Sequence, residues 1–427
     1  MLSGCVLTIE CLILMLLTSS GIQGRPVAII LVLIGLFSIA YFFDLSISRR
    51  LRPVAFPLAA GYLLRLGLLL FDLYGQSIYT LPNSGADSEM FFKQGVQCSL
   101  GQIENPGAFV AVLGILFAWL GTSRLFVQFL LMLCSVVSIH CAAIILDEVG
   151  VPTRQRRRTM YILCILPNFA ILSSLFLRES IVTMLLALSV LCMVRWKQRG
   201  SEGWFLLAFL LSCCAAMFHS GSIAAAMGYI LVRLFYDTRR GTIRFSWRNF
   251  LPALVLLLVF LYLFNNYSDV FFGKMIGLEG VEDIANTGSL GESSYAAYVG
   301  NSDSLSSMLL YTPVRIAFFL FSPFPWQWRG MSDVIAFCFS SLFYAWVLVK
   351  TFCYLGRKKA ENRELVIILL IVAFALLFVF AWGVSNTGTA VRHRDKAVVL
   401  YAVLLGLVWD GANGWGKEKC CVNRRTE

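Results

Sequence analysis

Charged residues are scarce in this chain, and their scarcity excludes most soluble folds. Only 14% of the 427 residues are Asp, Glu, Lys or Arg, whereas 59% are hydrophobic. A soluble domain of this length would contain helices with polar faces, but most segments here are apolar all round. The sequence therefore predicts an all-α, polytopic integral membrane protein, with a single membrane domain over residues 1–427.

Several motifs that would assign a chemistry are also missing. The thirteen cysteines lie chiefly inside apolar runs, and the sequence has no CxxC or Cys/His spacing of the kind that binds metal. It has no GxxxxGK[ST] segment for nucleotide phosphates. No basic region precedes the first apolar run, which contains Glu10, so we interpret this run as a first span rather than a cleaved signal. We expect neither a cofactor nor a resident metal.

The net charge of +11 comes from short basic clusters between the apolar runs. Cytoplasmic loops of membrane proteins carry such clusters, so the charge indicates topology rather than a nucleic-acid partner. Two long polar segments that are poor in basic residues, 73–106 and 267–307, are predicted to be extracytoplasmic loops, and 413–427 is predicted to be a basic cytoplasmic tail. The clusters predicted to be cytoplasmic are 48–52, 154–158, 195–199, 239–248, 356–359 and 417–425.

The alternation of inside and outside segments predicts about twelve spans. The number of crossings between an outer loop and the next cytoplasmic cluster must be odd. It would be even if the apolar pieces 107–121 and 308–322 also crossed. We therefore expect these two pieces to be re-entrant or interfacial. The predicted spans are roughly 5–20, 26–43, 54–72, 125–146, 159–176, 180–195, 204–218, 220–235, 250–266, 332–355, 364–385 and 397–412.

Two predicted hairpins, 159–194 and 204–232, are short for a full crossing. Each leg of the second has about 14 residues and reaches about 21 Å, against a hydrocarbon core about 30 Å thick. Its turn, FHSGS, centres on His219, and the first hairpin turns at LRES with Arg178 and Glu179. Irregular backbone at membrane depth is either buried in protein or lines a wet cavity. We expect these three residues to line a cavity open to the outside.

A basic cluster also lies on the predicted outer side, where such residues are rare. The segment NTGTAVRHR places Arg392, His393 and Arg394 there, against the positive-inside bias. We expect this cluster at the rim of the cavity. Snorkelling of these side chains to anionic headgroups is the alternative.

Other ionisable residues also have purely structural interpretations. Arg178 and Glu179 are able to form an interfacial ion pair that only marks a turn, and His219 is able to pack between helices. Arg65 lies within an apolar run, and Asp72, two turns later, is its expected structural partner. Ionisable groups inside a membrane are costly and more often functional than not, which favours the cavity interpretation for the first three.

Arginines that converge on a partly buried, outward-facing cavity suit a phosphate or diphosphate, since guanidinium pairs bidentately with such oxygens. Arg315, on the piece 308–322, is a further candidate. Trp326, in SPFPWQW, offers an aromatic face to a sugar ring or to the headgroup region. The segment NSGADSEMFF contributes the carboxylates Asp87 and Glu89, which are able to hold a divalent ion through water.

These segments resemble the Wzy/EpsG-type polymerases of bacterial O-antigen and exopolysaccharide. The family shows an Arg-Asp/Glu/Gln pair that opens one helix and an FH-S element on the next hairpin, as in SLFLRES and AAMFHSGS here. NTGTAVRHR is similar to a GT-x-R-x-R element of its late outer loop. The likeness covers about 155–235 and 380–400, with support from GADSEMFF and PFPW. The chain departs from the pattern because its longest outer loop is acidic rather than strongly basic.

The resemblance implies a multi-span glycosyltransferase of the GT-C type in the bacterial plasma membrane, with its active site facing the extracytoplasmic side. Its substrate would be an undecaprenyl-diphosphate-linked oligosaccharide repeat unit, and its other partners membrane lipids, a chain-length regulator and a flippase. The expected base is His219, followed by Asp87 and then Glu179. Arg178 is expected to be catalytic, because it would stabilise the charge on the diphosphate. The residues expected to bind the diphosphate or sugar are Arg392, His393, Arg394, Arg315 and Trp326.

Three other functions remain open on the sequence alone. A glycosyltransferase that uses a polyprenyl-monophosphate sugar would carry acidic residues in an outer loop, as GADSEMFF does, but would need fewer arginines. An O-antigen ligase would use a similar arginine clamp with a different acceptor. A flippase of lipid-linked oligosaccharide would favour two pseudo-symmetric halves, and we detect no internal repeat.

Overall fold

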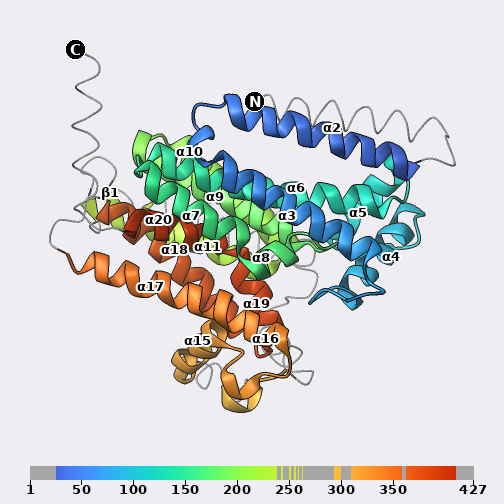
Figure 1. The fold of residues 1–427 in the computed structure, drawn as a ribbon. Helices are drawn as coiled ribbons and strands as arrows, with labels where there is room; N and C mark the ends of the chain where they lie inside the picture. Colours follow the sequence, from blue (N-terminus) through green and yellow to red (C-terminus); the bar gives the residue numbers. More distant parts are fainter. Residues whose placement is uncertain are drawn as a thin grey trace.

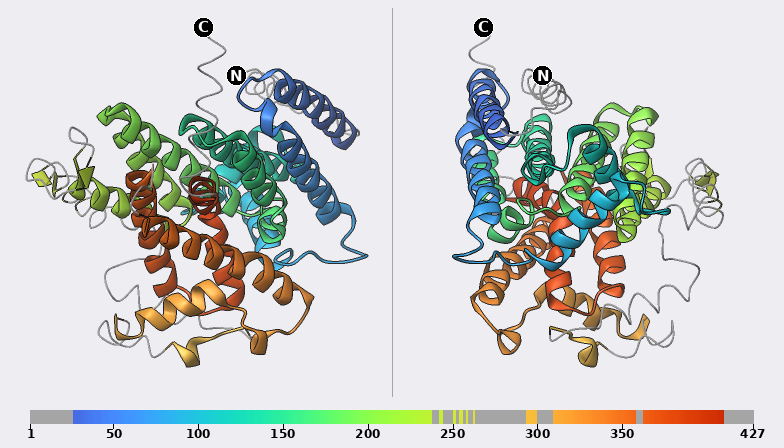
Figure 2. Two further views of the ribbon diagram at one scale, coloured as in Figure 1. Left: turned by 60° about the vertical axis from the view of Figure 1, so that its left-hand side comes forward. Right: turned by 90° about the vertical axis from the view of Figure 1, so that its right-hand side faces the viewer.

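The computed structural model of this chain is a bundle of helices (Figures 1 and 2). The strands among the described residues are β1 (Tyr236–Asp237) and β2 (Thr242–Ile243), which pair antiparallel. Apart from this pair, the predicted all-α class is confirmed for the part of the chain that is described. The described residues are 26–237, 242–243, 250–251, 254–255, 258, 262, 293–299, 309–357 and 362–409.

Six helices in the described part are long and apolar enough to cross a membrane. They match the predicted spans 26–43, 54–72, 125–146, 180–195, 332–355 and 364–385. The set identifies a polytopic membrane protein. The six are α2 (Pro26–Ile47), α3 (Ala55–Tyr74, preceded by η1, Arg52–Val54), α6 (Arg124–Glu148), α9 (Glu179–Arg199), the continuous α16–η5–α17 (Met331–Ala336, Phe337–Ser341 and Leu342–Leu355) and α18 (Arg363–Trp382).

The other apolar helices are shorter, so the count of twelve spans is not confirmed. The pieces 107–121 and 308–322 form α5 (Ala108–Leu120) and α15 (Thr312–Phe321). At 1.5 Å per residue these reach about 20 Å and about 15 Å, too short for a core of about 30 Å. Their length fits the expectation that neither piece crosses. The remaining short apolar helices are α10 (Glu202–Phe218), α11 (Ile223–Phe235, preceded by η2, Ser220–Ser222) and α20 (Val398–Val408).

One predicted span, 159–176, is broken in two. Helix α7 (Thr153–Ile165) ends where Pro167 begins α8 (Pro167–Leu172). Proline has no backbone N–H and its ring clashes with the preceding turn, so a single straight helix cannot continue through this point. Predicted span 5–20, most of 250–266, most of loop 267–307 and the tail 413–427 lie outside the described residues.

The break between α7 and α8 also explains where Arg65 bonds. Its guanidinium donates to the Cys164 carbonyl at 2.7 Å and to Ser173 Oγ at 2.9 Å. Asp72 instead accepts from Ser84 Oγ at 2.6 Å and Gln128 Nε2 at 2.9 Å. The expected Arg65–Asp72 pair is therefore wrong, because the end of α7 offers Arg65 a free carbonyl that a continuous helix would not.

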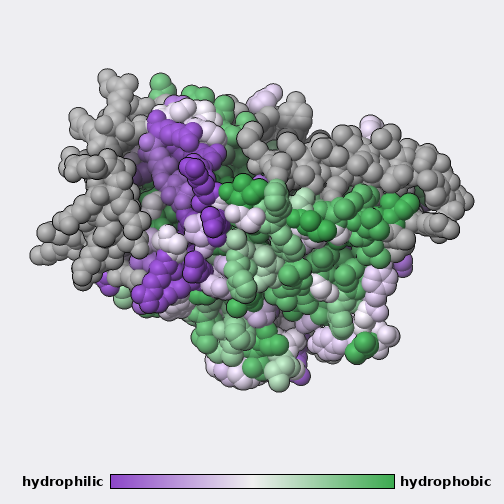
Figure 3. All heavy atoms as spheres, turned by 45° about the horizontal axis from the view of Figure 1, so that its top comes forward, coloured by the Kyte–Doolittle hydropathy of each residue, from purple (hydrophilic) through white to green (hydrophobic). Residues whose placement is uncertain are grey.

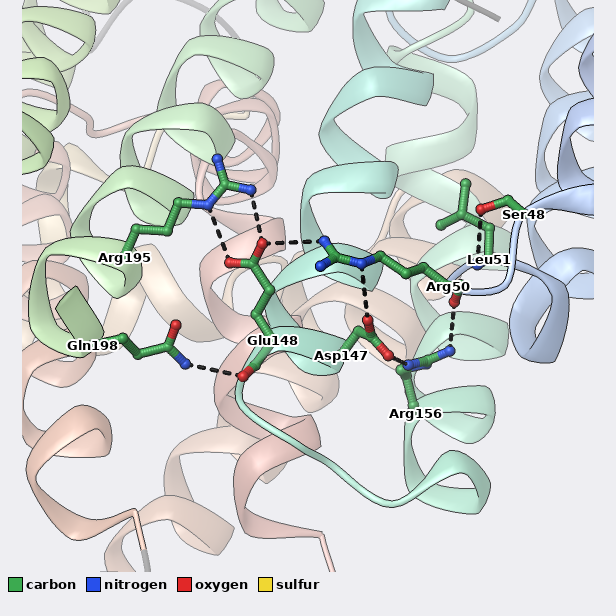
Figure 4. A network of polar contacts seen from close by, with 8 residues as sticks. All are labelled: Ser48, Arg50, Leu51, Asp147, Glu148, Arg156, Arg195 and Gln198. Atoms are coloured by element: carbon green, nitrogen blue, oxygen red, sulfur yellow. Dashed lines mark hydrogen bonds and ion pairs between the residues drawn. The ribbon is translucent and has the colours of Figure 1, made fainter. Parts of the chain in front are cut away.

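An ionic network joins three of the basic clusters at one end of the bundle (Figure 4). Arg195 on α9 holds the Glu148 carboxylate with bonds of 2.8 and 3.1 Å, and Arg50 lies 3.4 Å from the same carboxylate. Arg156 pairs with Asp147 and donates to the Arg50 carbonyl at 2.6 Å. Clusters 48–52, 154–158 and 195–199 thus lie side by side, as their shared cytoplasmic prediction requires. Figure 3 shows hydrophilic side chains gathered mainly in one area of an otherwise largely hydrophobic face.

The interior is filled by α6, α9 and α20. Every residue of α20 is buried, and the helix packs against α6, α7, α9, α17 and α18. Helix α19 (Thr387–Lys396) directly precedes α20 and packs against α8, α9, α15 and α18. A helix that is buried on all sides needs no polar face, which explains the uniform apolar sequence of 398–408.

Candidate functional site

Four segments that are distant in the sequence meet at the candidate site. They are the start of α4 (Ala86–Ser99), the loop that leads into α9, the turn between α10 and α11, and α19. Asn386 caps α19, because its side-chain oxygen accepts from the amides of Gly388 at 2.9 Å and Thr389 at 3.3 Å. Glu179 occupies the first turn of α9, where a negative charge is favoured by the helix dipole.

Arg392 joins two of these segments to its own helix. Its Nε and Nη2 donate to Glu179 Oε1 at 3.2 and 2.7 Å, and its Nη1 pairs with Asp87. Glu179 is 5% exposed. Burial lowers the pKa of Arg392, but the Glu179 and Asp87 carboxylates raise it by more, so its pKa lies above the usual range. The guanidinium is therefore a fixed cation between two carboxylates.

His219 and His393 contact each other next to this ion-pair cluster. Their ring centroids lie 4.4 Å apart at an interplanar angle of 79°, and Phe380 packs edge-on against both rings. The close packing requires a glycine at 221, since an added Cβ there would lie 2.7 Å from the Phe380 ring. The turn at 218–222 and the RHR segment are thus held in direct contact.

His393 has a defined tautomer. Its Nδ1 lies 2.8 Å from the Thr389 carbonyl, an acceptor, so Nδ1 carries the proton and Nε2 keeps a lone pair. Burial lowers the pKa of His393 well below its usual range, and Lys396 and Arg392 lower it further. His393 is therefore a neutral imidazole at neutral pH, in the form that accepts a proton.

Several polar atoms of this cluster lack hydrogen-bond partners among the described residues. They are Arg178 Nε, Glu179 Oε2, His219 Nδ1 and Lys396 Nζ. The Arg178 guanidinium lies 5.6 Å from the centroid of the Phe91 ring. Buried polar groups in proteins nearly always have a partner, so a concentration of such atoms indicates a place for water or a polar ligand. The Arg178 guanidinium, a donor with a fixed positive charge, favours an anion there.

Two arginines expected at the site bind backbone carbonyls instead. Arg394 donates to the carbonyls of Phe319 at 3.1 Å and Ser322 at 2.8 Å, to Ser341 Oγ at 3.1 Å, and also to the Leu320 carbonyl. Arg315 is 1% exposed and its Nη1 lies 3.4 Å from the Trp382 carbonyl. These contacts place Arg394 at the end of α15 and Arg315 against the end of α18, whereas Arg392 alone of the RHR arginines bonds to Asp87 and Glu179.

Trp326 lies on an exposed aromatic pair. Its side chain is 68% exposed, and its ring stacks on Phe324 with centroids 4.6 Å apart and an interplanar angle of 5°. It belongs to η4 (Pro325–Gln327), which follows α15. The exposed face suits a sugar ring or the headgroup region.

Sequence reasoning missed Arg124 and Lys396. Arg124 pairs with Glu89 and lies near the rings of Phe92 and Phe176. Its position between two apolar pieces on the outer side was the available signal. Lys396 is in the same ionisable run as the RHR cluster, but nothing in the sequence distinguishes a buried lysine from an interfacial one.

The described residues contain no group of three or more His, Cys, Asp or Glu side chains placed to hold a metal ion. No family model matches the chain, and no curated protein or solved structure is significantly similar to it.

Proposed function

We propose that this protein polymerises oligosaccharide repeat units carried on undecaprenyl diphosphate, at the extracytoplasmic face of a bacterial plasma membrane. The observation that carries the proposal is the convergence of Arg392, Asp87, Glu179 and the His219–His393 pair from four segments. A fixed cation, a neutral imidazole and carboxylates in one cluster are the groups that glycosyl transfer from a diphosphate needs.

In the proposed reaction a hydroxyl of the acceptor sugar attacks the anomeric carbon of the donor chain. The bond between that carbon and the diphosphate oxygen breaks, and its electron pair leaves with undecaprenyl diphosphate. Arg392 and Arg178 stabilise the charge that develops on the diphosphate. The hydroxyl proton passes to the histidine pair, where His393 Nε2 is the available acceptor and His219 lies in ring contact with it.

The proposed base is therefore the His219–His393 pair rather than His219 alone. Asp87 is a weaker candidate because it is already paired with Arg392, and Glu179 accepts two bonds from the same guanidinium. Arg394 takes a supporting role, because it positions the end of α15 and thereby the aromatic pair Phe324–Trp326. Arg315 supports the same helix, because it joins α15 to the end of α18. That pair is the proposed sugar platform.

The distribution of charge supports an enzyme with one open side over a flippase. The ionic network of Arg50, Asp147, Glu148, Arg156 and Arg195 ties together the helix ends at the predicted cytoplasmic side. A flippase needs a cavity that opens in turn to both sides. Such a network would have to break in every cycle of transport.

One observation favours a second candidate, a glycosyltransferase that uses a polyprenyl-monophosphate sugar. Asp87 comes from the outer loop 73–106, and its carboxylate reaches the cluster through Arg392. A carboxylate so placed is able to act as base for an acceptor hydroxyl. Donor preference separates the two candidates, since only the polymerase requires a diphosphate-linked oligosaccharide.

The test is complementation of a strain that lacks this gene, with surface glycan separated by size. Wild type is expected to restore a ladder of polymer, and Arg392→Ala and His393→Ala to leave single lipid-linked repeats at normal protein levels. Arg329→Ala is the matched control, because Arg329 is half-exposed and pairs only with Asp333 among the ion pairs described. Accumulation of repeats on the cytoplasmic side would identify a transporter instead. A normal ladder in the deletion strain would refute the proposal.

A further inference from the structure

Lys396 is a buried lysine that the proposed reaction has not used. It is the last residue of α19 and is 1% exposed. Its Nζ has no hydrogen-bond partner among the described residues and lies 5.8 Å from the centroid of the Phe380 ring. The same ring packs against His219 and His393. The amine therefore shares an aromatic neighbour with both imidazoles.

Titratable and charged groups face Lys396 from the start of α9, the turn after α10, α11 and α19 itself. Arg392 and Arg178 oppose its charge, and Glu179, the one carboxylate in this set, is already bound by Arg392. A small cavity of about 10 Å³ also borders Lys396, Ser189 and Tyr229. It has room for roughly one water molecule. Helices α18 and α20 present apolar side chains to this cavity. Among the described residues the set is Arg178 and Glu179 at the start of α9, His219 in the turn after α10, Tyr229 on α11, and Arg392 and His393 on α19.

The protonated form of Lys396 is poorly compensated in this setting. Burial lowers its pKa well below the usual range, Glu179 raises it, and Arg178 and Arg392 lower it further. An ammonium group without a partner in an apolar environment is strongly unfavourable. A second anion beside the cluster would supply the missing counter-charge and favour the protonated amine.

We propose that Lys396 is a third cation of the anion site, neutral in the free protein and protonated when a diphosphate occupies the cluster. The inference rests on the proposed function for the identity of the anion. The shared chemistry is the diphosphate group, whether it is free or attached to a polyprenyl lipid. Binding of this group is then coupled to the uptake of one proton.

The coupling means that Lys396 already carries its proton when the donor diphosphate is bound. The acceptor O–H bond breaks and its proton goes to His393 Nε2, while the new glycosidic bond forms and the bond to the diphosphate breaks. The proton then leaves the imidazole for water, because the Lys396 amine is already protonated. The Lys396 ammonium faces the diphosphate that has just gained the electron pair. Release of the diphosphate returns the proton, and Lys396 is neutral again.

Calorimetric titration of the full-length protein in detergent with inorganic pyrophosphate tests this inference. The titration is repeated at neutral pH in buffers with different ionisation enthalpies, so that the number of protons taken up follows from the slope. We expect uptake of about one proton per pyrophosphate for wild type, since linkage requires it when binding shifts a pKa across the working pH. Lys396→Met is expected to abolish the uptake and to weaken binding by about tenfold or more.

Lys350→Met is the control, because Lys350 is exposed on α17, and it should leave both quantities unchanged. A second arm uses undecaprenyl diphosphate in the same detergent. Equal uptake with both ligands shows that the diphosphate group is what the site recognises, and uptake with the lipid alone identifies the lipid as the source. Wild-type protein that binds either ligand without proton uptake, or binds neither, overturns the inference even where Lys396→Met fails to fold.

The outcome is distinguishable from that of the proposed function. Proton-coupled binding of pyrophosphate in a protein whose deletion leaves the glycan ladder normal would refute polymerisation and keep the anion site. A ladder that depends on the protein, with no proton uptake on binding, would refute only the role of Lys396.

Discussion

Replacement of Arg392 by alanine tests the centre of the site through stability as well as activity. Arg392 donates three charge-assisted hydrogen bonds, two to the buried Glu179 and one to Asp87. Its removal leaves Glu179 as a buried carboxylate whose other oxygen already has no hydrogen-bond partner among the described residues. We expect the variant to be destabilised chiefly by this uncompensated charge.

The two ion pairs contribute unequally to the expected magnitude. The Asp87 side chain is 45% exposed, so its pair with Arg392 contributes about 0–1 kcal/mol. The Glu179 side chain is 7% exposed and that of Arg392 17%, and loss of one partner from a buried pair costs about 3–5 kcal/mol. The total is about 3–6 kcal/mol, and its lower end corresponds to roughly a hundredfold change in the folding equilibrium. Adding Glu179→Gln should recover most of this loss, because the neutral amide needs no cation.

Denaturant titration in mixed detergent micelles measures both effects, with the glycan ladder as the activity readout. The double variant Arg392→Ala/Glu179→Gln should approach wild-type stability while polymerisation stays absent, since the clamp on the diphosphate is gone. If the single variant unfolds at the wild-type denaturant concentration and gains nothing from Glu179→Gln, the argument from a buried ion pair is refuted.

Three further predictions concern α19 and the histidine pair. Arg394→Lys should destabilise the protein by about 2 kcal/mol or more, because one ammonium group cannot replace the fork that reaches the carbonyls around Ser322; unchanged denaturant stability would contradict this. Burial raises the pKa of Asp395 to about 7 from an unfolded value of 3.8. The stabilisation that its protonated form provides is therefore present at low pH and is lost as the pH rises through about 7. Asp395→Asn should flatten the pH dependence of the unfolding free energy between these two pKa values, and an unchanged slope would exclude the effect. Gly221→Ala should displace the Phe380 ring, separate His219 from His393 and reduce polymerisation at near-normal expression, whereas a normal ladder would show that the close approach is unimportant.

The sequence was sufficient to predict the long helices and some members of the central cluster. Apolar runs of about 20 residues predict helices that match α2, α3, α6, α9 and α18. Length and composition alone are enough to predict a helix of this kind. Arg178, Glu179, His219 and the RHR segment were grouped by topology, and the structure brings Glu179 to Arg392 and His219 to His393.

The roles within that group were not predictable from the sequence. Arg392 and Arg394 are two positions apart on one short helix and therefore point in different directions, one to carboxylates and the other to carbonyls at the end of α15. Similarly, Arg65 bonds to the end of α7 rather than to Asp72, because Pro167 breaks a segment whose hydropathy predicts one continuous span. Such choices depend on three-dimensional neighbours that no local pattern encodes.

The complete burial of α20 has a consequence for how the protein is made. This helix is synthesised after every other helix that packs against it, yet all eleven of its residues lie inside the described part of the bundle. The helices made earlier must therefore remain loosely associated, or reopen, until α20 arrives, and the cluster on α19 is assembled in the same late step. A ribosome that stalls before residue 398 leaves a chain that contains α19 but lacks the buried helix against which six other helices of the described part pack.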